Sequence, residues 1–173
     1  PMQSNTSIMN KKVILWFANN QCGSIRRNSA ATISGGWLIS LEDEIKKNPG
    51  VELNVAFFSK VKENPFDYDG VRYYPMYSPI SKNKIVRVIG RLKSKEEKDK
   101  QMLSLMLDVV KDVKPDIIHI HGTEERFGLI QDYVKDIPIV FSIQGLIAPY
   151  SEKFFSGLPQ AFAYKNDPIY DVM

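Results

Sequence analysis

The chain has 173 residues, of which 43% are hydrophobic and 25% are charged, and its formal net charge is +3. This length suits one domain with a buried core, and the composition is that of an ordinary soluble globular protein. The net charge is too small to indicate nucleic-acid binding by itself. A single cysteine, Cys22, and two histidines are too few for a disulfide framework or a structural zinc site. We therefore expect a cytoplasmic protein in a reducing compartment, with no metal and no nucleic-acid partner.

The sequence predicts neither a membrane span nor a signal peptide. No apolar run approaches the ~20 residues that span a bilayer, and residues 1–11 lack the apolar stretch of a signal peptide. We expect residues 1–11 to be disordered or vector-derived, and residues 12–173 to form the folded domain.

The first half of the domain reads as strands around one helix. Lys12–Ala18 is a continuous apolar run, typical of a strand covered on both faces. After a long polar segment, Ser34 is a suitable N-cap for a helix that runs to about Lys47. Val51–Phe58 is predicted to be a second strand and Val71–Met76 a third, at a sheet edge, because Pro75 cannot donate a ladder hydrogen bond. The apolar stripe of the helix consists of Trp37, Leu38, Leu41 and Ile45.

The second half alternates helices and strands. Lys84–Leu92 and Glu96–Val113 have helical spacing. Asp116–His121 and Pro138–Ile143 then read as strands on either side of a helix, Glu124–Val134. Such a strand–helix–strand unit implies parallel strands. The predicted fold is therefore α/β, an open and mostly parallel Rossmann-like sheet with helices on both faces.

Polar residues or glycines follow three of the predicted strands. Open parallel sheets bind ligands outside the carboxyl ends of their strands, and polar strand ends suit a hydroxyl-rich ligand. Ordinary polar loops explain the pattern equally well. The residues concerned are Asn19, Asn20, His121, Gly122, Thr123, Gln144 and Gly145.

A glycine pair and a histidine are the strongest candidates for binding chemistry. Gly35 and Gly36 open the first helix, where exposed backbone amides and the helix dipole favour phosphate; a simple turn is the alternative. His121 ends a strand, where its imidazole could accept a proton or bind a sugar hydroxyl. His119 shares its strand face and is expected to be a hydrogen-bonded core histidine. The sequence contains no G-x-G-x-x-G after the first strand and no P-loop, which argues against a dehydrogenase or a P-loop NTPase.

Basic residues lie on one face of the helix predicted over Lys84–Leu92. No acidic residue occurs between Ser78 and Lys95, and no aromatic residues are interleaved with the basic ones, which disfavours nucleic acid. A basic amphipathic helix can lie on anionic lipid, so peripheral contact with the inner face of a membrane is one interpretation. A solvated face over a buried stripe is the other. The basic residues are Lys84, Arg87, Arg91 and Lys95.

Three segments in this order resemble a known family. ISGGW, PDIIHIHG and PIVFSIQGL are similar to segments of the N-terminal domain of family-4-type retaining GT-B glycosyltransferases (the group 1 type). There the corresponding stretches read roughly G-G before a small or apolar residue, P-D-V-V-H-x-H, and P-x-V-x-T-x-H-G. The resemblance covers about Lys12 to Leu146.

The resemblance implies an enzyme of two Rossmann-like domains with its active site between them. The N-terminal domain would bind the acceptor, and the C-terminal domain would hold most of the nucleotide-diphosphate sugar; no further cofactor is implied. His121 matches the histidine that contacts the transferred sugar and is the expected catalytic residue. Gln144 stands where many relatives have His, which leaves it a hydrogen-bonding role. The expected substrate-binding residues are Gly35, Gly36, Asn19, Arg26, Thr123, Gln144 and Gly145.

The donor-binding domain of that family, with its basic residues and its E-x7-E pair, does not lie within these 173 residues. We therefore expect residues 12–173 to be a truncated acceptor-side domain whose partners are the missing C-terminal domain and a glycan or lipid-linked acceptor. The full enzyme would transfer a hexose with retention. Because a departing diphosphate needs charge stabilisation, we expect no turnover from this chain alone.

Two other functions fit the same sequence. A sugar-nucleotide epimerase on this fold would need a carboxylate or a second histidine at the strand ends, a role that only Glu124 or Glu125 could fill. A non-catalytic carbohydrate- or protein-binding module would bind its ligand without any partner domain.

Overall fold

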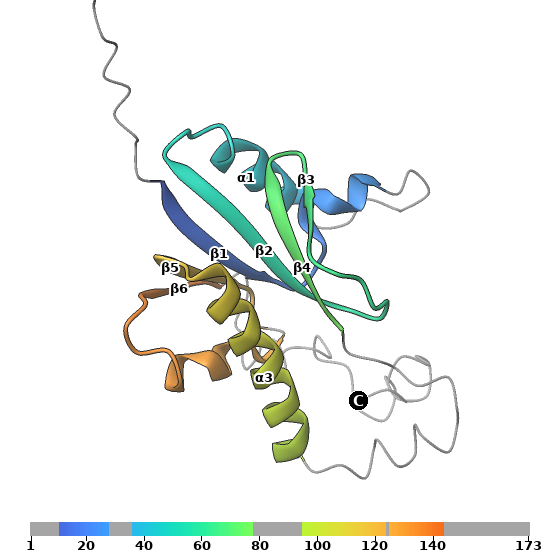
Figure 1. The fold of residues 1–173 in the computed structure, drawn as a ribbon, viewed down its shortest axis with the longest axis vertical. Coiled ribbons are helices and arrows are strands. Elements are labelled where there is room, and N and C mark those ends of the chain that lie inside the picture. Colours follow the sequence, from blue (N-terminus) through green and yellow to red (C-terminus); the bar gives the residue numbers. More distant parts are fainter. Residues whose placement is uncertain (1–10, 28–35, 78–94, 124, 144–173) are drawn as a thin grey trace, which may run out of the picture. The chain divides into compact units, whose positions relative to one another are not determined.

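The computed structural model describes residues 11–27, 36–77, 95–123 and 125–143, and it contains one six-stranded sheet (Figure 1). The strand order is β3-β4-β2-β1-β5-β6, and every neighbouring pair is parallel except β3 and β4. Apart from Ile143, the described residues belong to one compact unit, Pro1–Ser142. The elements are β1 Lys12–Ala18, η1 Cys22–Arg27, α1 Gly36–Ile45, β2 Val51–Ser59, β3 Phe66–Tyr68, β4 Val71–Tyr77, α3 Lys95–Val113, β5 Ile117–His121, η2 Arg126–Asp132 and β6 Ile139–Ser142.

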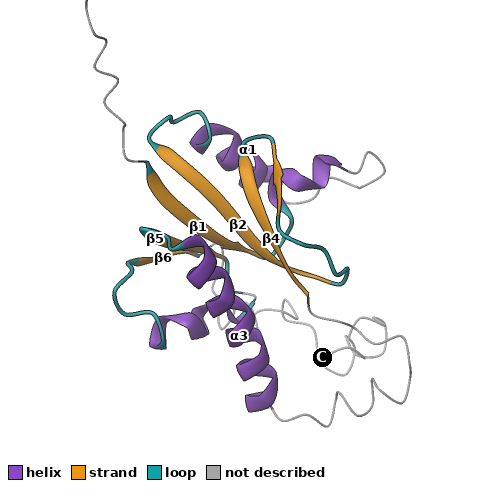
Figure 2. Cartoon of the chain, in the orientation of Figure 1, coloured by secondary structure: helices purple, strands orange, loops and turns teal. Residues whose placement is uncertain are grey.

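Helices pack on both faces of this sheet, as predicted (Figure 2). Side chains alternate along β1, so that Leu15 and Phe17 join the core on the α3 side, whereas Trp16 and Ala18 join the core on the α1 side. The α3-side core also contains residues of η2. The fold is therefore an open, mostly parallel α/β sheet. Its central strand β1 is covered on both faces, which explains why β1 reads as a continuous apolar run.

Most predicted elements lie within two residues of the observed bounds, but the third strand is not at the edge. A short strand, β3, pairs antiparallel with β4 and ends its register at Tyr73. Pro75 lies beyond that register and pairs only with Phe57 of β2. A proline is tolerated in this inner strand because no β3 residue lies opposite it.

The buried face of α1 matches most of the predicted stripe, because Leu38, Leu41 and Ile45 pack into the α1-side core, but it differs at other positions. Leu38, Ile39 and Glu42 are the buried residues of the helix, whereas Trp37 is 41% exposed. The Glu42 carboxylate accepts hydrogen bonds from the backbone N–H of Gly23 (2.9 Å) and from the hydroxyl of Tyr73 (2.8 Å). These two hydrogen bonds allow the acidic side chain of Glu42 to be buried, although a search for apolar positions would not assign it to the core.

Of the helices predicted in the second half of the chain, one is a 3₁₀ helix and one lies outside the described residues. The segment predicted as a helix over Glu124–Val134 is a short 3₁₀ helix, η2, which contacts α3. Its buried residues, Phe127 and Ile130, are three apart, a spacing that fits either kind of helix. The helix predicted over Lys84–Leu92 lies outside the described residues. Among the helices that are described, none is both long and apolar enough to cross a membrane.

Candidate functional site

His121 lies at the carboxyl end of β5, directly beside β1. In the parallel register Ala18 pairs with His121, so both point to the α1 side of the sheet. The imidazole of His121 is enclosed by three other rings. Its centroid lies 3.9 Å from that of His119, 4.4 Å from Trp16 and 5.6 Å from Trp37. These four side chains, Trp16, Trp37, His119 and His121, form what we call the His121 cluster.

Three polar atoms of the His121 cluster have no hydrogen-bond partner in the described part of the chain. They are both ring nitrogens of His121 and Nε1 of Trp16, and all three are buried. A buried polar atom without a partner costs about 1–3 kcal/mol, and such atoms are rare in folded proteins. Three of them at one strand end therefore mark a site where a ligand or water would supply the missing hydrogen bonds.

His121 is uncharged in this environment. Burial, and to a lesser extent the neighbouring His119, lower its pKa to about 3. A neutral imidazole has one N–H donor and one acceptor nitrogen. The cluster can therefore exchange hydrogen bonds with a hydroxyl group, but at neutral pH it does not offer a cation to a phosphate.

The burial of the two histidines is the reverse of the prediction: His121 is more buried than His119. His119 was predicted to be the core histidine, yet it is half-buried, and its Nε2 hydrogen-bonds the hydroxyl of Ser142 on β6 at 2.7 Å. The predicted hydrogen bond is confirmed and the core position is wrong. His121, predicted at the open strand end, is only 1% exposed because Trp16 and Trp37 pack around it.

The glycine pair and the histidine strand meet through Trp37. Gly36 is the first residue of α1, and Trp37 follows it directly and contacts His121. A Cβ atom added at Gly36 would meet no other atom within 4 Å, so the backbone there is open to a ligand. Gly35 lies outside the described residues. Trp37 of ISGGW and His121 of PDIIHIHG therefore meet at the carboxyl end of β5.

Asn19 and Arg26 have different positions relative to the His121 cluster. Asn19 follows β1, is exposed, and accepts a weak hydrogen bond from the Asn20 side chain at 3.3 Å. Arg26 lies in η1 and forms a bidentate ion pair with Asp43 of α1 (3.0 and 2.8 Å). Asp43 is seven residues after Gly36, roughly 10 Å farther along the helix axis. The charge of Arg26 is therefore paired with Asp43 and is not directed at His121.

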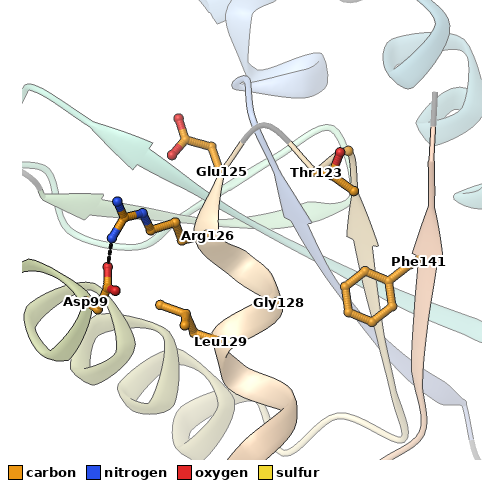
Figure 3. A pocket seen from close by; sticks show the side chains of 8 residues that line it. Asp99, Thr123, Glu125, Arg126, Gly128, Leu129 and Phe141 are labelled. Atoms are coloured by element: carbon orange, nitrogen blue, oxygen red, sulfur yellow. Dashed lines mark hydrogen bonds and ion pairs between the residues drawn. The ribbon is translucent and has the colours of Figure 1, made fainter. Parts of the chain in front are cut away.

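Thr123 belongs to a pocket on the other face of the sheet. Gly122, with a φ of +86°, turns the chain after β5, and its N–H donates to the carbonyl of Ser142 at 2.9 Å. The exposed Thr123 then lines a pocket of about 350 Å³ on the α3 side (Figure 3). Among the residues that share this pocket are Asp99, Glu125, Arg126, Gly128 and Phe141.

Most of the remaining predicted residues lie outside the described part of the chain. Gln144 and Gly145 lie outside the described residues, as do Lys84, Arg87 and Arg91 of the proposed membrane-contacting helix. Lys95, the fourth basic residue of that set, is the first residue of α3.

Sequence reasoning found Gly122, Thr123 and Glu125 of the pocket, but it did not find Trp16 or the pocket residues Asp99, Arg126, Gly128, Leu129 and Phe141. The Trp37 that follows the glycine pair was a usable signal, but it was assigned to the core stripe. Trp16 joins the site only through the register between β1 and β5, which no local pattern encodes.

Comparison with known proteins adds no assignment to this geometry. No protein-family model matches the chain, and no curated protein is significantly similar to it. Across the described ranges, no group of three or more His, Cys, Asp or Glu side chains is arranged to hold a metal ion.

Proposed function

We propose that this chain is the acceptor-side half of a retaining, sugar-nucleotide-dependent GT-B glycosyltransferase. The observation that carries the proposal is the His121 cluster, in which a neutral histidine with two unpaired ring nitrogens ends a parallel strand beside the first turn of α1. The carboxyl end of such a sheet is the usual ligand-binding edge. The resembling segments ISGGW and PDIIHIHG meet there.

Each residue of the site has a chemical role in this proposal. His121 hydrogen-bonds a hydroxyl of the transferred sugar and a hydroxyl of the acceptor sugar that receives it. The open backbone at Gly36, with Gly35 before it, approaches the donor diphosphate. Asn19, Thr123, Gln144 and Gly145 follow strand ends and contact the acceptor. Arg26 has a weaker claim, because Asp43 already neutralises its charge.

The charges around His121 favour a two-domain enzyme. A departing nucleoside diphosphate needs cationic or hydrogen-bonding groups aimed at its developing charge. None of the four rings of the His121 cluster supplies a cation, since burial lowers the pKa values of both histidines. The diphosphate charge is therefore assigned to a second, C-terminal domain, and this chain alone is expected to bind acceptor without turnover.

The epimerase alternative has less support. It requires a carboxylate or a second histidine at the strand end. Glu125 lines the pocket on the α3 side, whereas His121 points to the α1 side. The neighbouring His119 is engaged by the Ser142 hydroxyl at 2.7 Å. Glu124 lies outside the described residues.

Ligand-detected NMR on the 173-residue chain tests the proposed function. The panel contains nucleotide-diphosphate sugars, free nucleotides and candidate acceptor glycans, each also measured with the variant His121→Phe. Weak binding of a glycan, lost in the variant, with little binding of nucleotides is the expected result. Tight nucleotide binding by this chain would overturn the assignment to the acceptor half, and no glycan binding at millimolar concentration would overturn the assignment to a carbohydrate-acting enzyme.

A further inference from the structure

The pocket on the α3 side of the sheet is separate from the His121 cluster. It lies between α3, η2 and the loop that follows β5 (Figure 3). Its volume of about 350 Å³ falls within the ~300–1,000 Å³ of small-molecule sites. The pocket is therefore large enough for a small ligand, and its lining determines which kind.

Charged side chains from two elements occupy one side of the pocket. Arg126, the first residue of η2, forms an ion pair with Asp99 of α3. The exposed Glu125 lines the same pocket. An ion-paired carboxylate and guanidinium hold each other in place and still keep lone pairs and N–H groups for a ligand. With two acidic groups and one basic group, the lining has a net charge of −1, which disfavours phosphate and other anions.

An aromatic ring forms the other side of the pocket. Phe141 of β6 is 38% exposed, and a Cβ atom added at Gly128 would lie 3.6 Å from its Cε1 atom. In Figure 3 the side-chain-free Gly128 of η2 lies between the Phe141 ring and the Asp99–Arg126 pair. The face of an aromatic ring carries partial negative charge and attracts polarised C–H groups. The pocket therefore combines an apolar, C–H-binding ring with several groups that hydrogen-bond hydroxyls.

We propose that this pocket binds a neutral pyranose ring, one sugar residue of the acceptor. The C–H face of the ring stacks on Phe141, and its hydroxyls hydrogen-bond Asp99, Glu125 and Arg126. The inference rests on the proposed function, because it takes the acceptor to be a carbohydrate. His121 and Thr123 are two residues apart, at most about 7 Å along the chain. Both residues lie at the same end of β5, but their sites are on opposite faces of the sheet, so the pocket holds a sugar residue of the acceptor other than the one at His121.

Backbone-amide NMR titration of the 173-residue chain tests the pocket. The probes are the methyl glycosides of neutral hexopyranoses, with inorganic phosphate for comparison. We expect a glycoside, and not phosphate, to shift the amide signals of Gly122, Gly128 and Leu129, which line the pocket. Shifts caused only by phosphate would overturn the neutral-sugar assignment.

Variants separate this inference from the proposed function. Phe141→Ala should weaken glycoside binding at least tenfold, and the exposed Glu125→Gln, which carries little folding risk, should weaken it severalfold. The control Tyr133→Ala removes an exposed aromatic residue that follows η2 and does not line the pocket, so binding should not change.

Two results would overturn the pocket proposal. Glycoside shifts confined to the surroundings of Trp37 and His121, unaffected by Phe141→Ala and Glu125→Gln, would remove the pocket and leave the proposed function intact. If a 100-fold excess of glycoside shifted no amide signal anywhere in the chain, both the pocket proposal and the proposed function would be overturned.

Discussion

The imidazole ring of His121 meets the indole ring of Trp37 edge to face, with ring centroids 5.6 Å apart and an interplanar angle of 65°. This contact joins the end of β5 to the first turn of α1, two segments far apart in the sequence. It also covers a histidine whose two ring nitrogens have no partner among the described residues. The structure therefore places a costly, unsatisfied group at the carboxyl end of the parallel strands.

Replacing His121 by Phe should separate stability from binding. Phenylalanine keeps a planar ring in contact with Trp16 and Trp37 but removes two buried nitrogens that lack partners. Because each such atom costs about 1–3 kcal/mol, we expect the free energy of unfolding to rise by about 1 kcal/mol. Glycan binding should weaken at least tenfold. Urea unfolding and ligand-detected NMR measure the two effects.

His119→Phe is the matched control for this substitution. It removes the hydrogen bond between His119 Nε2 and the Ser142 hydroxyl, so it should not increase stability. A loss of stability in His121→Phe together with unchanged binding would contradict the assignment of a ligand site to the His121 cluster.

Acidification should destabilise the protein through His121. Its pKa is lowered to about 3 in the folded state by burial and by His119, against about 6.5 in the unfolded chain. Between these values the unfolded chain binds a proton that the folded protein does not, so the free energy of unfolding falls as the pH is lowered. The slope is at most about 1.4 kcal/mol per pH unit, or about 2 kcal/mol between pH 6.5 and 5.

Urea unfolding at pH 7 and pH 5, with the wild type and His121→Phe, isolates this effect. Burial also lowers the pKa of His119, which acts in the same direction in both proteins, so the difference between them reports on His121. The variant should lose less stability at pH 5 by about 2 kcal/mol. Equal losses would show that His121 takes up its proton in the folded state as readily as in the unfolded chain.

Much of the fold follows from local patterns, and the site follows only in part. The apolar run of β1, the strand-like pattern of β2 and the helical spacing of α3 were sufficient to predict a parallel α/β sheet and the bounds of these elements. The three-residue β3 was missed because so short a strand has little pattern of its own. The spacing of Phe127 and Ile130 cannot separate a 3₁₀ from an α-helix over a single short segment.

The end of β5 was predicted correctly as a polar strand end, but the burial of His121 was not. That burial depends on Trp16, which reaches the site through strand pairing, and on Trp37, which was assigned to the core. Both contacts arise from tertiary packing between segments that the sequence pattern treats separately.

Two glycines at the site should respond differently to substitution by alanine. Gly122 has a φ of +86°, which costs an L-residue about 1–2 kcal/mol, so Gly122→Ala should destabilise the protein by that amount. Gly36 begins α1 with open space around it, so Gly36→Ala should leave stability unchanged or slightly higher. Thermal unfolding measures both variants. A destabilising Gly36→Ala would indicate a structural need for glycine there and would weaken its assignment to ligand approach.

The buried carboxylate of Glu42 should couple energetically to Gly23. A Cβ atom added at Gly23 would collide with the Glu42 carboxyl group, which accepts the Gly23 N–H at 2.9 Å and the Tyr73 hydroxyl at 2.8 Å. Glu42→Ala leaves these two donors without their acceptor and should cost about 2–3 kcal/mol. Gly23→Ala should cost about 1–3 kcal/mol in the wild type because of the collision.

A double-mutant cycle tests this coupling. In the Glu42→Ala background the collision partner is gone, so Gly23→Ala should cost less than in the wild type by about 1 kcal/mol or more. Urea unfolding of the four proteins gives the coupling energy. Strictly additive costs would mean that η1 and α1 adjust independently, and that the Glu42 carboxylate does not hold η1 against the helix.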